Sequence, residues 1–250
     1  MPAPNPSKSK TERADALLTN RGLCDSREQA KRLILAGEVR SGERLIDKPS
    51  TKLPLDAPLA VKAKPRFVGR GGFKLEGALD AFAIDPNGWV CLDVGASTGG
   101  FTDCLLQRGA LRVHAVDVGT NQLVWKLRND PRVIVREQFN ARQMVLADLG
   151  ESVRLAVMDL SFISLTKVLP AVFSVLAEDG GVVCLIKPQF ELRREDVGKG
   201  GIVRDLTLHQ RAIDKIRSFV TGDLGREWRG LIASPITGTD GNQEFLAWLG

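Results

Sequence analysis

The chain has 250 residues, 43% of them hydrophobic and 26% charged, which is typical of a globular protein with one large domain or a medium domain and a small attachment. No apolar run approaches the roughly 18 residues that a membrane-spanning helix needs. Residues 1–10, with three prolines and no apolar core, predict a disordered tail and not a signal peptide. The net charge of +5 is uneven, because residues 1–74 hold 16 Lys and Arg against 8 Asp and Glu, while the remainder holds 19 against 22. A basic front half suggests contact with a polyanion, although a solvated charged surface gives the same composition.

The cysteines argue against a disulfide or zinc framework. Four are present, they are scattered along the chain, and three lie in segments with an apolar pattern. This usage predicts reduced core residues of a cytoplasmic protein, and no metal site. These residues are Cys24, Cys91, Cys104 and Cys184.

The first predicted elements form a small α+β unit. Helices are expected over residues 11–20 and 26–36, each opened by the hydroxyl side chain of its first residue. A strand, a tight turn and a second strand follow over residues 38–46, and residues 59–61 read as a short last strand.

Three short motifs in this unit, at residues 13–17, 26–31 and 37–42, resemble a known RNA-binding module. It is the small domain shared by ribosomal small-subunit protein four, pseudouridine synthases and tyrosyl-tRNA synthetases, and the resemblance covers about residues 11–63. In that family the second helix meets RNA phosphates, and a Lys/Arg surface has the chemistry to neutralise them. The resemblance places this contact on Arg27, Lys31 and Arg32.

Residues 64–72 are basic and contain three glycines and a proline, which predicts a linker that contributes Arg70 as a further candidate RNA contact. An amphipathic helix is expected over residues 73–82. Residues 68–79 closely match the V-S-R-G-G-x-K-L-x-x-A-L signature of the TlyA family, with Gly69 in place of the usual serine. These are hemolysin-like ribosomal RNA 2′-O-methyltransferases related to the FtsJ-type enzymes. The resemblance implies a methyltransferase domain over residues 73–250.

Residues 90–94 form a short apolar run that predicts a buried parallel strand, and a glycine-rich turn and a helix follow it. The glycines allow a tight turn and the close approach of a ligand, and the free N–H groups of the helix start can hold a polar group. The pattern G-x-x-x-G-G, with an aspartate two residues before it, resembles motif I of S-adenosylmethionine-dependent methyltransferases. The alternative is an ordinary turn that uses glycine for geometry alone. The candidate cofactor-binding residues here are Asp93, Gly95, Ala96, Ser97, Gly99, Gly100 and Phe101.

Two more candidate cofactor contacts follow the next strands. Asp117 comes directly after the apolar residues 113–116, and an acid at that position can accept hydrogen bonds from a ribose diol. Residues 133–135 predict a third strand that ends near Asn140. Many methyltransferases have an acid there to meet the adenine amino group, and Asn140 is a plausible substitute.

Polar side chains also follow the fourth and fifth predicted strands. Asp159 ends residues 155–158, Lys187 ends residues 181–186, and Glu244 is the one charged residue of an expected last strand. Ligands of open parallel sheets gather at the carboxyl ends of the strands. We therefore expect an α/β fold, a Rossmann-like and mostly parallel sheet with helices on both faces. The acids and the lysine should converge at one edge: Asp93, Asp117, Asp159 and Lys187.

The TlyA and FtsJ pattern carries a Lys-Asp-Lys-Glu tetrad, and the resemblance implies Lys74, Asp159, Lys187 and Glu244. A ribose 2′-hydroxyl must lose its proton as it attacks the sulfonium methyl group. A partly desolvated lysine beside another cation can accept that proton, which makes Lys187 the candidate base. Lys74 would stabilise alkoxide charge, the two acids would orient the lysines, and Asp159 is also a candidate contact of the methionine ammonium.

Three hypotheses of different classes remain open. The first is an RNA 2′-O-methyltransferase, for which the family implies cytidine in ribosomal RNA and a partner in ribosomal RNA or ribosomal subunits. The second is a membrane-lytic protein, suggested only by the hemolysin label of the family, and the third is a ribosome-binding factor without activity. Base methylation fits less well, because Asp159 begins Asp-Leu-Ser-Phe and not the Asn/Asp-Pro-Pro-aromatic loop of amino-group methylation. Cytosine carbon-5 methylation needs a nucleophilic cysteine, and Cys184 lies inside a predicted strand.

Overall fold

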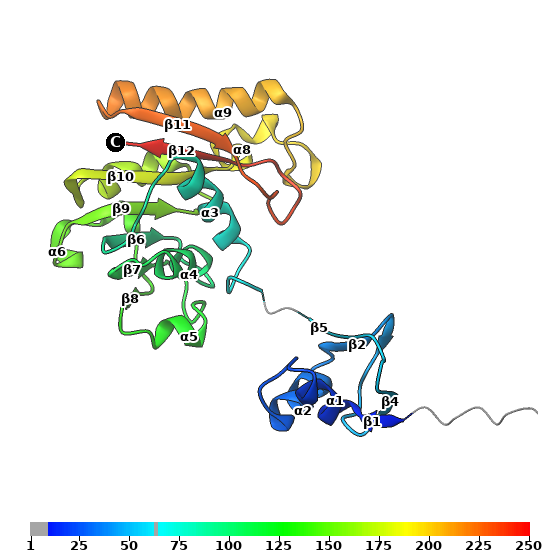
Figure 1. Cartoon of the computed structure of the whole chain (residues 1–250). Coiled ribbons are helices and arrows are strands. Elements are labelled where there is room, and N and C mark those ends of the chain that lie inside the picture. The colour runs from blue at the N-terminus through cyan, green and yellow to red at the C-terminus, as the bar shows by residue number, and fades with distance from the viewer. Residues whose placement is uncertain (1–9, 63–64) are drawn as a thin grey trace, which may run out of the picture. The chain divides into compact units, whose positions relative to one another are not determined.

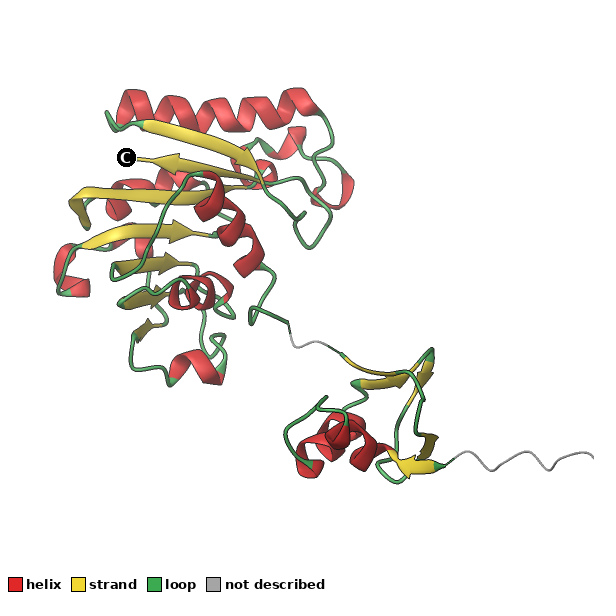
Figure 2. Ribbon diagram, in the orientation of Figure 1, coloured by secondary structure: helices red, strands yellow, loops and turns green. Residues whose placement is uncertain are grey.

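A computed structural model describes residues 10–62 and 65–250, and the chain divides into two compact units, Met1–Pro65 and Arg66–Gly250 (Figures 1 and 2). The tail expected at residues 1–10 lies, except for Lys10, outside the described residues. Among the helices of the described ranges, none combines the length and the apolar character needed to cross a membrane.

The first unit is a small α+β fold in which two helices pack on each other beside short antiparallel strands. Strand β1 pairs with β4, and a separate sheet has the order β3-β2-β5. A compact core holds it together, including Leu18, Ile34, Val39 and Ile46. The elements are β1 (Thr11–Arg13), α1 (Ala14–Asn20), α2 (Arg27–Leu35), β2 (Val39–Ser41), β3 (Arg44–Leu45), β4 (Lys52–Pro54) and β5 (Leu59–Val61).

The first helix begins later than predicted. Thr11 does not cap it, because residues 11–13 form β1 and pair with β4, with Glu12 opposite Leu53. Pairing with a distant strand has overridden the local cap signal. The prediction for the second helix is confirmed, since the Ser26 hydroxyl accepts from the Gln29 backbone N–H at 3.2 Å.

The second unit is built on one seven-stranded sheet with the order β11-β12-β10-β9-β6-β7-β8, which Figure 1 shows fanning across the unit. The strands run parallel except for β12, which is antiparallel to both of its neighbours. The strands are β6 (Val90–Val94), β7 (Arg112–Val116), β8 (Val133–Arg136), β9 (Val153–Met158), β10 (Leu176–Ile186), β11 (Trp228–Ala233) and β12 (Phe245–Leu249).

Helices cover both faces of this sheet, as predicted, because alternate residues of the buried strands point to opposite sides. One core cluster joins residues of β6 such as Cys91 to α3 and α4, and the other joins Leu92 and Val94 to α7 and α9. The helices are α3 (Gly71–Ala81), α4 (Gly100–Gln107), α5 (Trp125–Arg128), α6 (Leu146–Leu149), α7 (Leu169–Phe173), α8 (Pro188–Glu191) and α9 (Leu206–Ser218).

Most of the linker expected at residues 64–72 belongs to this second unit instead. Phe67 is buried and its ring meets that of Phe73 edge-on at 5.0 Å between centroids. The backbone N–H of Val68 donates to the Asp103 carboxylate at 2.9 Å, and α3 already begins at Gly71. The basic residues of this segment suggested a solvated link, whereas its one large apolar side chain anchors it in the core.

Candidate active site

The four predicted catalytic side chains form two close ion pairs on one cavity of about 260 Å³. Lys74 Nζ lies 2.5 Å from Glu244 Oε2, and Lys187 Nζ lies 2.6 Å from Asp159 Oδ1. Three of the four residues are buried, with Asp159 somewhat more open. Water is therefore largely excluded from the charges, which strengthens their interaction.

The topology explains how segments so far apart in sequence meet. Asp159 and Lys187 directly follow the parallel strands β9 and β10, so they lie at the same edge of the sheet. Glu244 is not inside the last strand as predicted, since β12 begins at Phe245. Because β12 runs antiparallel to β10, its beginning lies at the edge where β10 ends. Lys74 reaches the cavity from α3.

Lys187 has a further partner that the sequence analysis did not identify. Its Nζ donates to the Ser161 hydroxyl at 3.1 Å, and Ser161 also lines the cavity. The ammonium is therefore held between a carboxylate and a hydroxyl, both on the loop that follows β9. Ser161 stands two residues after Asp159, so proximity to that acid was the available signal.

The glycine turn lines the same cavity through Gly95, Ala96, Ser97, Gly100 and Phe101. Its first glycine is required by the protein's own backbone. Gly95 has φ +82°, and a Cβ there would lie 2.7 Å from the carbonyl oxygen of Asp159.

Gly99 does not line the cavity and serves packing. Its φ is +98°, and a Cβ would lie 2.3 Å from Leu127 Cδ1, on the core side of the turn. The sequence predicts that Gly99 leaves room for a ligand. A side chain at this position would instead clash with the protein's own core.

Asp93 lies beneath the turn and does not line the cavity. Its side chain is fully buried and accepts from the Thr102 hydroxyl at 2.6 Å, while its Oδ1 has no partner among the described residues. Burial raises the pKa of this carboxyl to about 7, against the hydrogen bond from Thr102, and the nearby Asp159 adds to the rise. Asp93 thus supports the start of α4 from below.

A second cavity, of about 330 Å³, continues from the first and shares Gly95, Ser97, Asp159 and Ser161 with it. Asp117 and Asn140 line this part together with apolar side chains. Its apolar lining comes from Val94, Val116, Val118, Phe139, Ala141, Leu160, Phe162, Ile163 and Val168.

Asp117 and Asn140 are held by local bonds. The Asp117 carboxylate accepts from the backbone N–H groups of Ser97 at 2.8 Å and Gly119 at 2.7 Å. Asn140 caps a short turn by accepting from the N–H of Arg142 at 3.2 Å. Both sequence candidates therefore lie where expected, with their orientation fixed by neighbouring backbone.

This groove fits the cofactor expected from the sequence. Its apolar part suits an adenine, the fixed carboxylate of Asp117 can accept from a ribose diol, and the glycine turn with Asp159 suits an amino acid moiety. Among residues 10–62 and 65–250, no group of three or more His, Cys, Asp and Glu side chains is placed to hold a metal ion.

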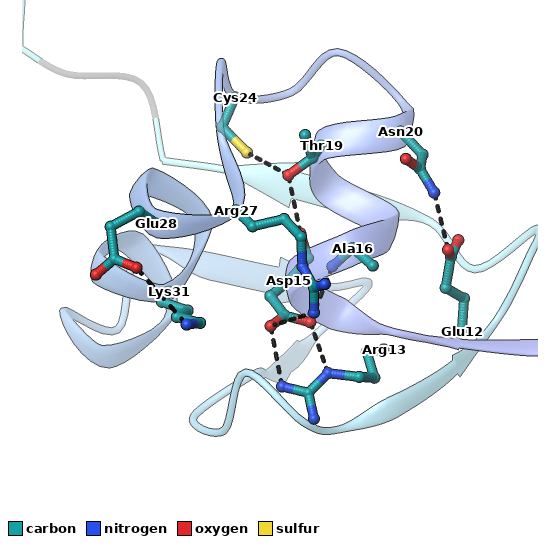
Figure 3. Close-up of polar contacts among 10 residues, drawn as sticks. All are labelled: Glu12, Arg13, Asp15, Ala16, Thr19, Asn20, Cys24, Arg27, Glu28 and Lys31. Carbon is teal, nitrogen blue, oxygen red and sulfur yellow. Dashed lines mark hydrogen bonds and ion pairs between the residues drawn. The ribbon is translucent and has the colours of Figure 1, made fainter.

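The candidate RNA contacts of the first unit are partly engaged within it (Figure 3). Arg27 Nη2 lies 3.2 Å from Asp15 Oδ2, and the same buried carboxylate accepts from Arg13 Nε at 3.0 Å and Nη2 at 2.9 Å. The bonds from Arg13 and then Arg27 lower the pKa of Asp15 to about 2, against the effect of burial. Lys31 pairs with Glu28 at 3.6 Å.

The first unit thus presents a pair of arginines that sequence analysis found only in part. Arg13 begins one of the motifs that resemble the RNA-binding module, but it is expected inside a helix there and is not named as an RNA contact. Arg32 is exposed on α2. Arg70, in the second unit, lines the catalytic cavity and donates to the carbonyl of Thr237 at 2.9 Å.

Comparisons with known proteins agree with this architecture. Residues 67–250 match the family model of the FtsJ-like methyltransferases, and residues 12–57 match the S4 domain. The 16S/23S rRNA (cytidine-2′-O)-methyltransferase TlyA of Mycobacterium tuberculosis is 47% identical over 96% of this chain and 90% of that protein. Hemolysin A of Brachyspira hyodysenteriae is 42% identical over 94% and 98%. A solved hemolysin-like structure from Streptococcus thermophilus has a TM-score of 0.72 and 46% identity, covering 97% of this chain and 89% of that one.

The predicted family, the fold class and the methyl donor S-adenosylmethionine are thereby confirmed, and the relatives named above carry both methyltransferase and hemolysin names. With an S4 domain ahead of a methyltransferase domain, the chain belongs to the TlyA family of FtsJ-like methyltransferases.

Proposed function

We propose that this enzyme methylates ribose 2′-hydroxyl groups of ribosomal RNA, with cytidine as the target nucleoside. The observation that carries the proposal is the pair of ion pairs, Lys74–Glu244 and Lys187–Asp159, on one cavity beside the cofactor groove. The name of the TlyA relative, a 16S/23S rRNA (cytidine-2′-O)-methyltransferase, supports the choice of substrate. The proposed partners are ribosomal RNA and ribosomal subunits, and the proposed location is the cytoplasm.

The residues of the cavity have complementary roles in this reaction. S-adenosylmethionine, when bound, supplies an electrophilic methyl group to the ribose oxygen and leaves as the neutral thioether. Lys187 Nζ accepts the proton of the 2′-hydroxyl as the new O–C bond forms, so the ammonium must first pass a proton to the Asp159 carboxylate with which it is paired. Asp159 and Ser161 set the direction of that amine.

Lys74 and Glu244 serve the charge that develops on the ribose oxygen. The Lys74 ammonium can stabilise a partial alkoxide, and its short contact with Glu244 fixes where that positive charge lies. Positioning hydroxyl, methyl group and sulfur in line supplies much of the remaining rate enhancement.

We assign cofactor binding to Gly95, Ala96, Ser97, Gly100, Phe101, Asp117, Asn140 and Asp159, which line the two connected cavities. Asp93 and Gly99 support the turn that carries them. RNA phosphates are assigned to the surface of Arg27, Lys31 and Arg32, with Arg13 added, in the first unit and to Arg70 at the cavity, since each presents a cation that can pair with phosphate.

Cytosine carbon-5 methylation is disfavoured by the state of the cysteines. All four are buried and none lines the catalytic cavity. Burial raises the pKa of the Cys91 and Cys104 thiols to about 12, and raises that of Cys184 as well. A thiol that stays protonated at neutral pH is a poor nucleophile.

The test is transfer of a labelled methyl group from S-adenosylmethionine to naked ribosomal RNA and to purified ribosomal subunits, followed by nucleoside analysis. The expected product is 2′-O-methylcytidine, and 5-methylcytidine or an absence of transfer to every RNA form would contradict the proposal. Leakage of liposomes caused by purified protein that is free of bound lipid would instead favour the lytic hypothesis.

A further inference from the structure

We infer that Glu191 is a positioning residue for methyl transfer, because it fixes the far end of the loop that carries Asp159. This inference rests on the proposed function. Glu191 does not line the catalytic cavity, and it lies on α8, four residues after Lys187. Residues 159–165, which join β9 to the next helical turn, are called the β9 loop below.

The Glu191 side chain is buried, and its hydrogen-bond partners belong to two segments, the β9 loop and α9. Its Oε2 accepts from the Ser164 hydroxyl at 2.5 Å, and its Oε1 accepts from the backbone N–H of Leu165 at 2.7 Å. Lys215 of α9 lies 3.0 Å from Oε2 and also donates to the Glu191 carbonyl at 2.6 Å. The lysine compensates the buried charge, so the carboxylate is stable where it is.

Residues 187–191, which include α8, contact the β9 loop at both of its ends. Lys187 contacts Asp159 and Ser161 near the beginning of the loop, whereas Glu191 contacts Ser164 and Leu165 at its end. This segment is short and closed by a bond from Phe190 N to Lys187 O at 2.9 Å. A change at the Glu191 end therefore shifts the loop relative to Lys187, whose reaction depends on the placement of Asp159 and Ser161.

The middle of the loop needs such support. Phe162 has φ +64°, a left-handed conformation that is costly for a bulky residue, and its side chain is 90% exposed. Strain of this kind persists only where the surroundings fix it. Few contacts hold Phe162 directly, among them the Phe190 ring at 5.1 Å between centroids, so the fixed ends must hold the loop.

The decisive variant is Glu191→Ala, tested in the full chain with RNA. We expect kcat to fall by about 10- to 100-fold, the size of effect that a misplacement near 1 Å can cause. The KM for RNA should stay within about threefold, and the KM for the cofactor should change by less than kcat, although the β9 loop also lines the cofactor groove. The kcat of Glu191→Gln should fall less, because the amide oxygen of the glutamine can still accept from the Leu165 N–H. Amide exchange of residues 159–165 should rise in Glu191→Ala.

The matched control is Glu195→Gln, since Glu195 is an exposed acid close by that pairs with Arg193 at 3.6 Å, and it should leave kcat and loop exchange unchanged. If Glu191→Ala does not fold, Ser164→Ala removes the hydroxyl contact with Glu191, together with that hydroxyl's bonds to Lys215 and Thr166, without stranding a charge. It should lower kcat several-fold. Ser164→Ala should also cost less in the Glu191→Gln background than alone, because both act through one contact.

A folded Glu191→Ala protein with wild-type kcat would overturn the inference. It would also be overturned if the fold-decreases in kcat caused by Ser164→Ala and Glu191→Gln multiply in the double variant, because the two residues would then act independently. Loss of cofactor affinity in proportion to kcat would also overturn it, because it would mark a general structural role. Failure of the proposed function is seen separately, as wild-type protein that methylates no RNA. The amide hydrogen exchange of residues 159–165 tests the positioning role of Glu191 without RNA. Unchanged exchange in Glu191→Ala would contradict that role.

Discussion

Both units use buried carboxylates to hold cations, yet they leave those cations in opposite surroundings. In the first unit Asp15 is fully buried, while the side chains of Arg13 and Arg27 are 45% and 55% exposed. In the catalytic cavity the Lys74 and Glu244 side chains are only 9% and 3% exposed. The same chemical pairing is therefore placed once at the surface and once out of water.

The difference indicates what each pair is suited to do. Charges shielded from water interact strongly, are little affected by salt and keep one geometry, as proton transfer requires. Exposed guanidiniums anchored at one edge keep N–H groups free for phosphate, and their contribution falls as salt rises. Substitutions in the cavity should therefore change the rate, and those at the arginine pair should change affinity.

The largest effect is expected from Lys187→Ala. Methyl transfer should fall by roughly two to four orders of magnitude, the usual worth of a positioned base, while cofactor and RNA affinity stay nearly unchanged. Lys187→Arg should not restore the rate, because a guanidinium stays protonated. Single-turnover methylation measures both. Near-normal transfer by Lys187→Arg would show that the residue acts as a charge and not as a base.

Glu244→Ala should lower both the rate and the stability. It leaves the Lys74 ammonium buried without its partner, at a cost of about 3–5 kcal/mol in the free energy of unfolding. Urea unfolding of the full chain measures this cost. The double variant Lys74→Ala/Glu244→Ala should be more stable than Glu244→Ala alone, and a double variant that is the less stable of the two would show that the pair is not coupled.

Changing Arg13 and Arg27 together to Ala, in an Asp15→Asn background so that no buried carboxylate loses its partners, should weaken RNA binding by roughly 10- to 100-fold relative to Asp15→Asn alone and leave cofactor binding intact. The slope of log K against log salt should become shallower by about 1.4 for single-stranded RNA, if each arginine neutralises one phosphate. Titrations at several salt concentrations check this. The matched control is Arg154→Ala, an arginine of β9 that pairs with Asp179 at the surface. An unchanged slope in the double variant would remove the pair from the RNA surface.

The sequence predicted the site residues that lie next to a recognisable strand better than it predicted contacts between distant segments. Asp159 and Lys187 follow apolar strands directly, and parallel strands bring their ends to one edge, so their convergence was predictable. The bond between Lys74 and Glu244 spans 170 positions. Only the family pattern identified it, and the strand boundary at Glu244 was placed wrongly.

Other features needed the packed structure. The role of Asp93 beneath the turn depends on Thr102, and Gly99 is explained by the position of Leu127. The place of Arg13 on a strand could not be predicted locally, because β1 forms by pairing with a strand some forty positions away. The glycine pattern identified the turn correctly, but which atoms a side chain would meet is a property of tertiary packing.

The smallest expected effect is the acid sensitivity of the first unit. The folded pKa of Asp15, about 2, lies below its ordinary 3.8, so its ionised form stabilises the fold. That contribution is present above pH 3.8 and is lost as pH falls through about 2. It amounts to at most about 2 kcal/mol, because the partner arginines are half in water. Urea unfolding of the full chain, followed by NMR methyl signals of Leu17 and Leu18, should show this loss between pH 4.5 and 2. Asp15→Asn should be less stable at pH 4.5 and show a smaller loss, whereas equal losses in both proteins would mean that other groups set the acid sensitivity.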